Sequence, residues 1–339
     1  MVIGDSTHHS PLTTHYSHMS KYDVIIIGGA CAGLTAGLYS SRRALKTLIL
    51  TKNIGGQVVI TTEVENYPGT GESITGPLLM EKFKKQATDS GAEIKMAEVT
   101  SIEKQDALFT IKTKDEDFQA KTVILAFGLE QRKLGVLGEG ELTGRGVAYC
   151  ATCDGPLFKN KVVSVVGAGN SAFDAADYLS DICEKVYLIV RKGESGYRAE
   201  TVLVDAVKAK KNVEILNNTE IKEIVGEQKV ESAKLINNKT NEESQIDLNA
   251  VFVEIGWKTQ TQFVKDLVKM TDGGYVITDN KSQTSTPGIF AAGDVTDTPY
   301  KQIVISAGEG AKAALSAYAY IQKQRGQEAQ TTDFNRRKK

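Results

Sequence analysis

The sequence Val24-Ile-Ile-Ile-Gly28-Gly-Ala-Cys-Ala-Gly33 joins an apolar run directly to a glycine-rich turn. A second stretch of the same kind, Val162-Val-Ser-Val-Val-Gly167-Ala-Gly169-Asn-Ser-Ala172, follows further along the chain. A continuous apolar strand that enters such a turn is typical of a parallel sheet buried on both faces. The helix after the turn presents backbone N–H groups at its N-terminus, which favour a phosphate. The two stretches therefore predict two nucleotide sites in one chain.

The first of these fingerprints departs from the pattern G-x-G-x-x-G at one position. Gly28 and Gly33 fit, but Ala30 stands where a glycine lets the backbone approach a pyrophosphate. Thr51, at the end of the next predicted strand, replaces the acid that commonly binds a ribose hydroxyl. A glycine-rich turn without a ligand is the alternative interpretation, which the helix N-terminus after Gly28 disfavours.

The second fingerprint fits the related pattern G-x-G-x-x-A through Gly167, Gly169 and Ala172. Three basic residues follow the next predicted strand: Arg191, Lys192 and Arg198. An NAD site carries an acid in this region, whereas cations favour the 2′-phosphate of NADP through charge-assisted hydrogen bonds. The pattern predicts NADPH over NADH, and a solvated basic turn is the alternative.

Strands and helices alternate around both fingerprints. The predicted strands cover residues 21–27, 47–51, 123–126, 161–166, 185–190 and 288–294. The predicted helices cover residues 34–43, 172–180 and 306–323, and Leu34, Leu38 and Ala44 are buried candidates of the first. This alternation predicts the α/β class, with two Rossmann-like, three-layer nucleotide-binding domains.

Between the fingerprints lies a pair of cysteines followed by an acid, Cys150-Ala-Thr-Cys153-Asp154. The order predicts a relay from a reduced nicotinamide through a flavin to a disulfide. A zinc site is disfavoured, because the only other cysteines, Cys31 and Cys183, are not spaced as a ligand pair. A structural thiol pair is the other alternative, but it does not explain Asp154, which is suited to moving protons to and from thiols. Cys31 and Cys183 are interpreted as packing residues.

Composition narrows the class of protein further. The chain has 339 residues and a formal net charge of -1, so no global field indicates a nucleic-acid partner. It contains no apolar run of the roughly 20 residues that span a bilayer and no export signal, which predicts a cytoplasmic location. All four histidines lie in residues 1–20, a predicted disordered tail, so a general acid or base in the body must be another residue type. Residues 326–339 are predicted to be a second disordered tail.

From residue 22 to residue 321 the chain resembles the low-molecular-weight thioredoxin reductases. The resemblance is carried by these segments: Gly55-Gly-Gln57, Thr61-Thr-Glu-Val-Glu-Asn66-Tyr-Pro-Gly69, Gly76-Pro-Leu-Leu-Met80, Gly144-Arg-Gly-Val147, Cys150-Ala-Thr-Cys-Asp-Gly155, Ala291-Ala-Gly-Asp-Val295 and Tyr300-Lys-Gln302. It implies a homodimer that reduces thioredoxin, with an NADPH domain (134–257) inserted into a discontinuous FAD domain (21–133 and 258–325). Hinges are expected near residues 132–133 and 257–258, where the smaller domain turns during turnover.

The resemblance also implies roles for individual residues. Cys153 faces the flavin, Cys150 attacks the thioredoxin disulfide, and Asp154 is the acid–base residue. FAD is held by Gly28, Gly33, Gly56, Gln57, Asn66, Gly293, Asp294, Lys301, Gln302 and Ile303. NADPH is held by Gly167, Gly169, Asn170, Ser171, Ala172, Arg191, Lys192 and Arg198.

The chain departs from the family at several positions. Cys31 stands for a usual proline, Lys301 for a usual arginine, Phe127 for a usual threonine, and Val190-Arg-Lys192 for a usual His-Arg-Arg. The last change leaves open a related flavin disulfide reductase that uses NADH or ferredoxin, or another small redox protein as acceptor. A ferredoxin–NADP reductase and a flavin-containing redox sensor are further alternatives, and neither needs the dithiol.

Overall fold

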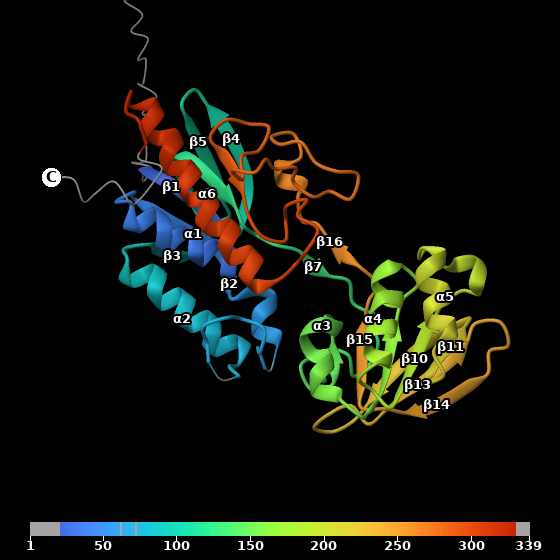
Figure 1. The fold of residues 1–339 in the computed structure, drawn as a ribbon. Coiled ribbons are helices and arrows are strands. Elements are labelled where there is room, and N and C mark those ends of the chain that lie inside the picture. The colour runs from blue at the N-terminus through green and yellow to red at the C-terminus, as the bar shows by residue number, and fades with distance from the viewer. Residues whose placement is uncertain (1–20, 62, 72, 330–339) are drawn as a thin grey trace, which may run out of the picture.

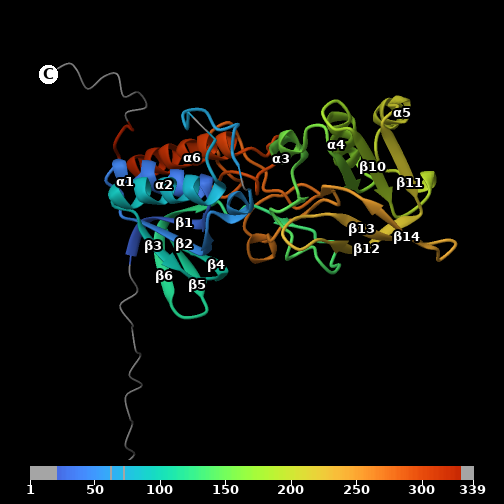
Figure 2. The same ribbon diagram turned by 90° about the horizontal axis from the view of Figure 1, so that it is seen from below.

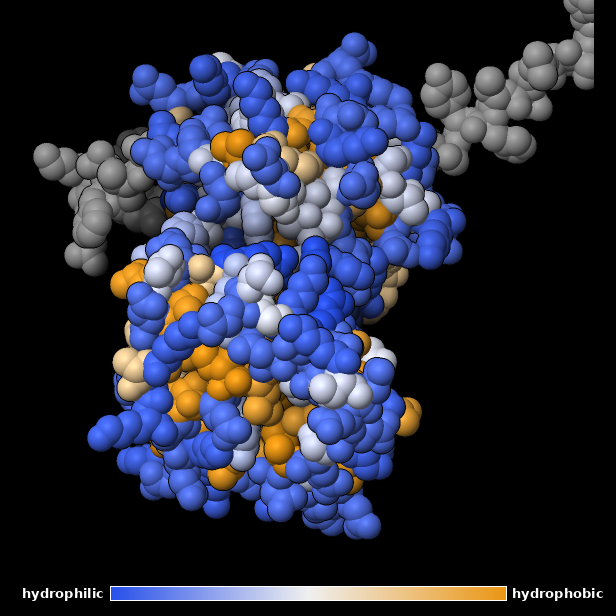
Figure 3. Space-filling model, turned by 90° about the vertical axis from the view of Figure 1, so that its right-hand side faces the viewer, coloured by the Kyte–Doolittle hydropathy of each residue, from blue (hydrophilic) through white to orange (hydrophobic). Residues whose placement is uncertain are grey.

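The computed structural model describes residues 21–61, 63–71 and 73–329, which form two bodies lying side by side (Figure 1). The tail predicted for residues 1–20 lies outside the described residues, as does the tail predicted at residues 326–339 except for its first four residues. None of the helices in the described ranges is long and apolar enough to cross a membrane. Figure 3, viewed from the right-hand side of Figure 1, shows hydrophilic residues over most of this face and apolar residues gathered in its lower half.

The first body is built on a seven-stranded sheet in the order β3-β2-β1-β6-β5-β4, with β17 paired to β6. Its central strand β1 pairs in parallel with both β2 and β6, so the run of residues 24–27 is buried on both faces. The strands are β1 (Lys21–Gly29), β2 (Thr47–Ile54), β3 (Glu93–Met96), β4 (Val99–Gln105), β5 (Leu108–Thr113), β6 (Asp117–Leu125) and β17 (Ile289–Ala291).

Three helices lie together on one face of this sheet (Figure 2). They are α1 (Cys31–Arg42), α2 (Gly76–Asp89) and α6 (Ile303–Gln324), and a 3-10 turn, Gly56–Ile60, follows β2. Small buried residues such as Ala36 on α1 and Ala313 and Ala317 on α6 form one apolar cluster with strand residues of β1 and β2. Small side chains let the two helix backbones pack closely, which holds the turn after β1 against the start of α6.

Two details of the predicted helices are corrected. The helices begin two or three residues earlier than predicted, at Cys31, Asn170 and Ile303, because the residues of their first turns already belong to them. Ala44 is not buried: α1 ends at Arg42, and Ala44 is exposed in a left-handed conformation with φ of 58°. The neighbouring Leu45 fills the core instead.

The second body has a five-stranded sheet in the order β11-β10-β9-β15-β8, all parallel where paired. Its strands are β8 (Val147–Ala148), β9 (Val162–Val166), β10 (Lys185–Val190), β11 (Val213–Asn217) and β15 (Ala250–Val253). Helices α4 (Asn170–Ser180) and α5 (Thr201–Ala209) lie on one side of it, and an antiparallel sheet of β12 (Thr219–Val225), β13 (Ser232–Asn237) and β14 (Glu243–Asp247) lies on the other (Figure 2). This is a three-layer arrangement, and the predicted α/β class is confirmed.

Two short strands connect the bodies. β7 (Glu130–Gln131) leaves the first body and β16 (Trp257–Lys258) returns to it, and they pair antiparallel through Gln131 and Trp257. The remaining short elements are α3 (Ala151–Asp154) and 3-10 turns at Gly155–Phe158, Glu194–Gly196 and Gln262–Val264. The pair β7–β16 lies at or next to residues 132–133 and 257–258, where hinges were expected. The bounds of the two domains stay a prediction.

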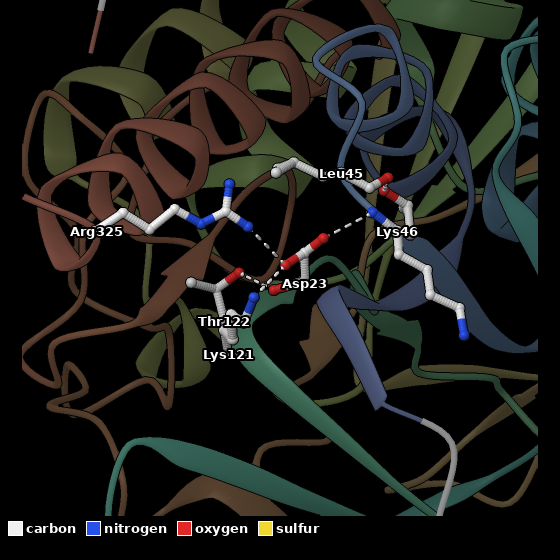
Figure 4. Close-up of polar contacts among 7 residues, drawn as sticks. Asp23, Leu45, Lys46, Lys121, Thr122 and Arg325 are labelled. Atoms are coloured by element: carbon white, nitrogen blue, oxygen red, sulfur yellow. Dashed lines mark hydrogen bonds and ion pairs between the residues drawn. The ribbon is translucent and has the colours of Figure 1, made fainter. Parts of the chain in front are cut away.

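Asp23 ties three elements of the first body together (Figure 4). Its carboxylate accepts hydrogen bonds from the Lys46 backbone N–H at 3.0 Å and the Lys121 ammonium at 2.7 Å, and Arg325 lies 3.5 Å away. Its backbone oxygen accepts from the Thr122 hydroxyl at 2.9 Å. Burial opposes ionisation of this carboxyl, but the Lys121 and Lys46 bonds prevail and lower its pKa. The cluster joins β1 and β6 to the end of α6.

Candidate functional site: a dithiol facing a nucleotide pocket

One pocket lies between the two bodies and brings most of the predicted flavin residues to the dithiol. The first body contributes Gln57, Asn66, Asp294, Lys301, Gln302 and Ile303 to its lining. The second body contributes Cys150, Cys153 and Asp154. The predicted flavin residues Gly28, Gly33, Gly56 and Gly293 are not in the lining. Gly56 and Gly293 each precede a lining residue, and Gly28 and Gly33 lie on either side of the lining residue Cys31.

The first fingerprint turn requires its glycines for reasons of space. Gly28 has φ of 116°, and an added Cβ would lie 2.2 Å from the Ala126 carbonyl oxygen. A Cβ on Gly33 would lie 1.9 Å from the carbonyl oxygen of Gly28. The residue before α1, Ala30, supplies no side-chain cap, so the first N–H groups of this 12-residue helix are left for another acceptor. The turn fits the pyrophosphate of a dinucleotide.

The pocket residue Gln57 has an acceptor without a partner. Its side-chain N–H donates to the Leu129 carbonyl at 3.1 Å, while its buried Oε1 has no hydrogen-bond partner in the part of the chain that the structure describes. Such an atom is costly to bury unless a ligand satisfies it. The flavin ring carries an N–H donor, so the orphaned oxygen fits FAD in this pocket.

Asp294 and Lys301 are two charged residues that the first body contributes to the pocket. Burial raises the pKa of Asp294, although the Ser306 hydroxyl donates to its Oδ1 at 3.1 Å and Lys301 also favours the carboxylate. Burial lowers the pKa of Lys301, whose Nζ donates to the Thr296 carbonyl at 2.7 Å. Buried groups of this kind gain from polar partners, and the hydroxyls of a flavin side chain are suitable ones.

Two further predicted flavin residues are joined to each other. The Asn66 side chain donates to Oε1 of Gln302 at 3.2 Å, and Gln302 is the residue before α6. Ile303 is the first residue of that helix. This bond fixes the loop around residue 66 over the start of α6.

The cysteines form the Cys150–Cys153 disulfide, with their Cα atoms 5.3 Å apart. Cys150 precedes the four-residue helix α3, which ends at Asp154. Burial raises the pKa of Asp154 to about 6. A carboxyl of this kind is partly protonated near neutral pH, so it is able to donate and accept protons beside the sulfurs.

The other two cysteines are buried. Burial raises the pKa of Cys31 to about 12 and that of Cys183 to about 11, which leaves few thiolates at neutral pH. Cys31, which belongs to the first fingerprint and was interpreted as a packing residue, also lines the pocket. No group of three or more His, Cys, Asp or Glu among the described residues is arranged to hold a metal ion.

The predicted NADPH residues form a separate site that does not line the pocket. Gly167 and Gly169 follow β9, and Asn170, Ser171 and Ala172 make up the first turn of α4. The Asn170 side chain accepts from the Glu200 backbone N–H at 2.9 Å. The Arg198 backbone N–H donates to the Ala168 carbonyl at 2.7 Å, so the basic segment folds back on the fingerprint.

Arg191, one of the basic residues of this site, has an acidic neighbour that the sequence did not predict. Arg191 follows β10, is 73% exposed, and places its Nε 3.5 Å from Oε1 of Glu220. Glu220 belongs to β12 and follows Arg191 by 29 residues in the sequence. Lys192 and the Arg198 side chain are exposed. A carboxylate beside Arg191 competes with a 2′-phosphate for that cation and repels the phosphate itself.

Known proteins resemble this chain over most of its length. The sequence pattern of the family described as pyridine nucleotide-disulphide oxidoreductase matches residues 22–310. The chain is 41% identical over 305 residues to thioredoxin reductase of Mycolicibacterium smegmatis, covering 89% of this chain and 97% of that one. It is 42% identical over 303 residues to thioredoxin reductase of Treponema pallidum, covering 89% and 98%.

Solved structures of thioredoxin reductases also resemble this chain, but they superpose on it with different TM-scores. Thioredoxin reductase from Streptococcus pyogenes superposes with a TM-score of 0.86 at 38% identity, covering 90% of this chain and 99% of that one. The Lactococcus lactis thioredoxin reductase in its FR conformation superposes with a TM-score of only 0.61 at 37% identity, covering 89% and 99%. Because identity and coverage are nearly equal, the lower score reflects a different spatial arrangement of matching parts.

Proposed function

This chain belongs to the pyridine nucleotide-disulphide oxidoreductase family, and from that premise we propose that it is a thioredoxin-disulfide reductase. It passes electrons from NADPH through FAD to the Cys150–Cys153 pair and from there to oxidised thioredoxin. The observation that carries the proposal is the pocket whose lining combines the dithiol with Gln57 and Asp294. Relatives named thioredoxin reductase at about 40% identity over most of the chain support the same acceptor.

The residues of the first body hold FAD, which when bound relays two electrons from the nicotinamide to the disulfide. The turn between Gly28 and Gly33, with Gly56 and Gly293, gives the backbone room to approach the cofactor. Gln57 and Asp294 satisfy their buried polar atoms on it. Asn66, Lys301, Gln302 and Ile303 complete the wall at the start of α6.

The dithiol then carries out two exchange steps. Two electrons break the Cys150–Cys153 bond and the sulfurs take up two protons, one of which Asp154 supplies. Each sulfur gives up its proton before it attacks, and two protons finally remain on the thiols of thioredoxin. The Cys150 thiolate attacks the disulfide of thioredoxin to form a mixed disulfide. The Cys153 thiolate then attacks the Cys150 sulfur, which restores the intramolecular disulfide and releases thioredoxin as a dithiol.

The nucleotide is held away from the pocket, at the second fingerprint. Its backbone N–H groups cradle the pyrophosphate at Gly167, Gly169, Asn170, Ser171 and Ala172, while Arg191, Lys192 and Arg198 favour the 2′-phosphate. Since these residues do not line the pocket, hydride transfer requires the NADPH domain (134–257) to turn on the strand pair β7–β16. The two TM-scores of 0.86 and 0.61 support a fold with two arrangements.

The assembly and location of the enzyme are also part of the proposal. The enzyme is a cytoplasmic homodimer without a nucleic-acid partner. The near-neutral charge balance of 41 basic and 42 acidic residues supports the last point, because nucleic-acid binding surfaces are strongly basic.

A different electron donor is the second candidate function. It is favoured by the Arg191–Glu220 pair, which weakens the case for a 2′-phosphate at that position. On this alternative NADH or another donor reduces the flavin, and the dithiol chemistry is unchanged.

A single experiment tests the function and separates the donors. Purified protein is expected to be yellow with bound FAD; it is mixed with NADPH and NADH separately, and bleaching of the flavin is recorded. Oxidised thioredoxin is then added and its free thiols are measured. NADPH should bleach the flavin at lower concentration than NADH, and thioredoxin should be reduced. A colourless protein that FAD does not reconstitute, or bleaching without thioredoxin reduction, would overturn the proposal.

A further inference from the structure

Glu254 is a partly buried carboxyl at the edge of the second sheet where the dithiol begins. It follows the last residue of β15, a strand that lies between β9 and β8. In β8 the partners of Val251 and Phe252 are Val147 and Ala148. The pairing ends at Phe252 and Ala148, two residues short of Glu254 and Cys150, so these two residues continue from adjacent strands at the same edge of the sheet.

The other neighbour of Glu254 is the second fingerprint. The Val253–Val166 pair of β15 and β9, continued by one residue, places Glu254 beside Gly167. Its backbone N–H donates to the Val166 carbonyl at 2.9 Å. A Cβ on Gly167 would lie 2.3 Å from the Glu254 carbonyl oxygen, so the two backbones are in close contact. Ligands of parallel sheets bind at this carboxyl edge.

The Glu254 side chain interacts with the helix that carries the dithiol. The backbone N–H of Ala151, the residue after Cys150, is a hydrogen-bond donor to its carboxyl group. The helix α3 has no side-chain cap, and Cys150 keeps an extended conformation that continues the strand pattern. Burial raises the pKa of Glu254 to about 7, although the Ala151 bond favours the charged form. The group therefore changes charge near neutral pH.

We propose that Glu254 is a positioning residue of the dithiol, which holds the first turn of α3 through Ala151 and exchanges a proton in response to the charge on Cys150. Reduction breaks the Cys150–Cys153 bond, adds two electrons from the reduced flavin and leaves negative charge on sulfur. A thiolate at Cys150 disfavours a second negative charge beside it, so Glu254 takes up a proton from solvent. Its deprotonation conversely raises the pKa of the Cys150 thiol, and the two groups titrate as a pair.

The other titratable groups around this point belong to few elements. β8, β9, β15 and the turn at residues 167–169 contain none. The groups on or next to α3 are Tyr149, Cys150, Cys153 and Asp154, and those on α4, which packs against α3, are Asp174, Asp177 and Tyr178. Asp174 is exposed and Asp177 pairs with Lys210 at 3.2 Å. Asp154 and Glu254 are therefore the two carboxyls of these elements whose pKa burial raises, and Asp154 is kept intact in every variant of the test.

The test measures the pKa of the Cys150 thiol directly. In a Cys153→Ser background, the rate of alkylation of Cys150 by iodoacetamide is followed against pH, and the modified cysteine is identified by mass spectrometry. Cys31 and Cys183 are buried and react slowly. With Glu254→Gln added, we expect the midpoint to fall and alkylation at pH 8 to be about three- to tenfold faster, which corresponds to a shift of about half to one pKa unit.

Two further variants keep the result interpretable. Glu227→Gln removes an exposed carboxyl of the same body, in the turn after β12, and should leave the midpoint unchanged. Glu254→Asp retains a carboxylate and should keep the midpoint closer to that of the parent, also where the glutamine variant does not fold. An unchanged midpoint in Glu254→Gln, an equal shift in Glu227→Gln, or an equal shift in Glu254→Asp overturns the inference.

The inference rests on the proposed function, and the two fail separately. If protein with both cysteines does not reduce thioredoxin, the proposed function is wrong. If it reduces thioredoxin but Glu254→Gln leaves the Cys150 midpoint in place, only the role of Glu254 is wrong.

Discussion

At the scale of single residues, the two sulfurs of the dithiol have different tasks. Cys150→Ser should leave reduction of the flavin by NADPH intact and abolish reduction of thioredoxin, because the thiolate that attacks the substrate disulfide is lost. Stopped-flow absorbance measures reduction of the flavin, and a thiol assay measures reduction of thioredoxin. Cys153→Ser should also abolish thioredoxin turnover, but only this variant should lose absorbance arising from a thiolate next to the flavin. Thioredoxin reduction by Cys150→Ser near the wild-type rate would mean that the disulfide is structural.

Asp154 is expected to make the rate of disulfide reduction depend on pH. Its pKa is raised to about 6 by burial, so the protonated form that donates to sulfur is lost as the pH rises through that value. The rate of disulfide reduction should therefore fall as the pH rises from 5 to 8, by roughly tenfold per unit above the pKa. Asp154→Asn should be slower at low pH and lose this dependence, while its FAD content stays unchanged. A variant with the same pH profile as the parent would exclude Asp154 as the proton donor.

Glu220 and Arg191 oppose each other in the choice of donor. Arg191→Ala should raise the KM for NADPH far more than that for NADH, since a charge-assisted contact of about 1.5–3 kcal/mol is lost. Glu220→Gln should act in the opposite direction and lower the KM for NADPH, because it frees Arg191 and removes a repulsive charge. Steady-state kinetics with both donors measure the ratio. Equal effects on NADPH and NADH would place the 2′-phosphate elsewhere.

At the scale of secondary-structure elements, the Asp23 cluster joins β1, β6 and the end of α6. Its carboxyl is 16% exposed, and the bond to Lys121 is charge-assisted. Asp23→Asn should lower the free energy of unfolding by about 2 kcal/mol at neutral pH, measured by urea denaturation followed by circular dichroism. Asp115→Asn, at an exposed residue of the same body, is the matched control.

The sign of the pH effect follows from the lowered pKa. Asp23 is easier to ionise in the folded than in the unfolded chain, so its stabilisation is fully present above the unfolded pKa. It is lost as the pH falls through the folded pKa. The difference between parent and Asp23→Asn should therefore shrink in acid, and a difference that grows in acid would contradict the assignment of the charge.

At the scale of the whole molecule, the β7–β16 connection must allow two arrangements of the bodies. Gly256, next to β16, has φ of 91° and open space around its missing Cβ, so its conformation rather than packing requires glycine. Gly256→Ala should disfavour this arrangement by about 1 kcal/mol and slow electron transfer from flavin to dithiol about fivefold. Gly91→Ala, with φ of 101° and similar open space, is the control for strain alone. Equal transfer rates in the two variants would remove Gly256 from the hinge.

The amino-acid sequence by itself determined the two strand–turn–helix units and the dithiol between them. These features are local: a buried parallel strand must be continuously apolar, and the positions of Gly28 and Gly167 leave no space for a side chain. Elements with weaker local signals were not predicted, among them α2 and the sheet β12–β14. The strand β14 is almost wholly exposed, so it shows no apolar periodicity.

Only the tertiary structure decided which distant residues meet. Gln57 and Asp294 line one pocket with Cys153 through the arrangement of the two bodies, and no local pattern encodes that. Glu220 lies beside Arg191 because β12 of the antiparallel sheet packs next to β10 of the parallel sheet. Glu254 comes near the dithiol because β15 and β8, far apart in sequence, are neighbours in one sheet. The order of strands is set by how the connections cross over and by which faces bury apolar surface, so it depends on the whole chain at once.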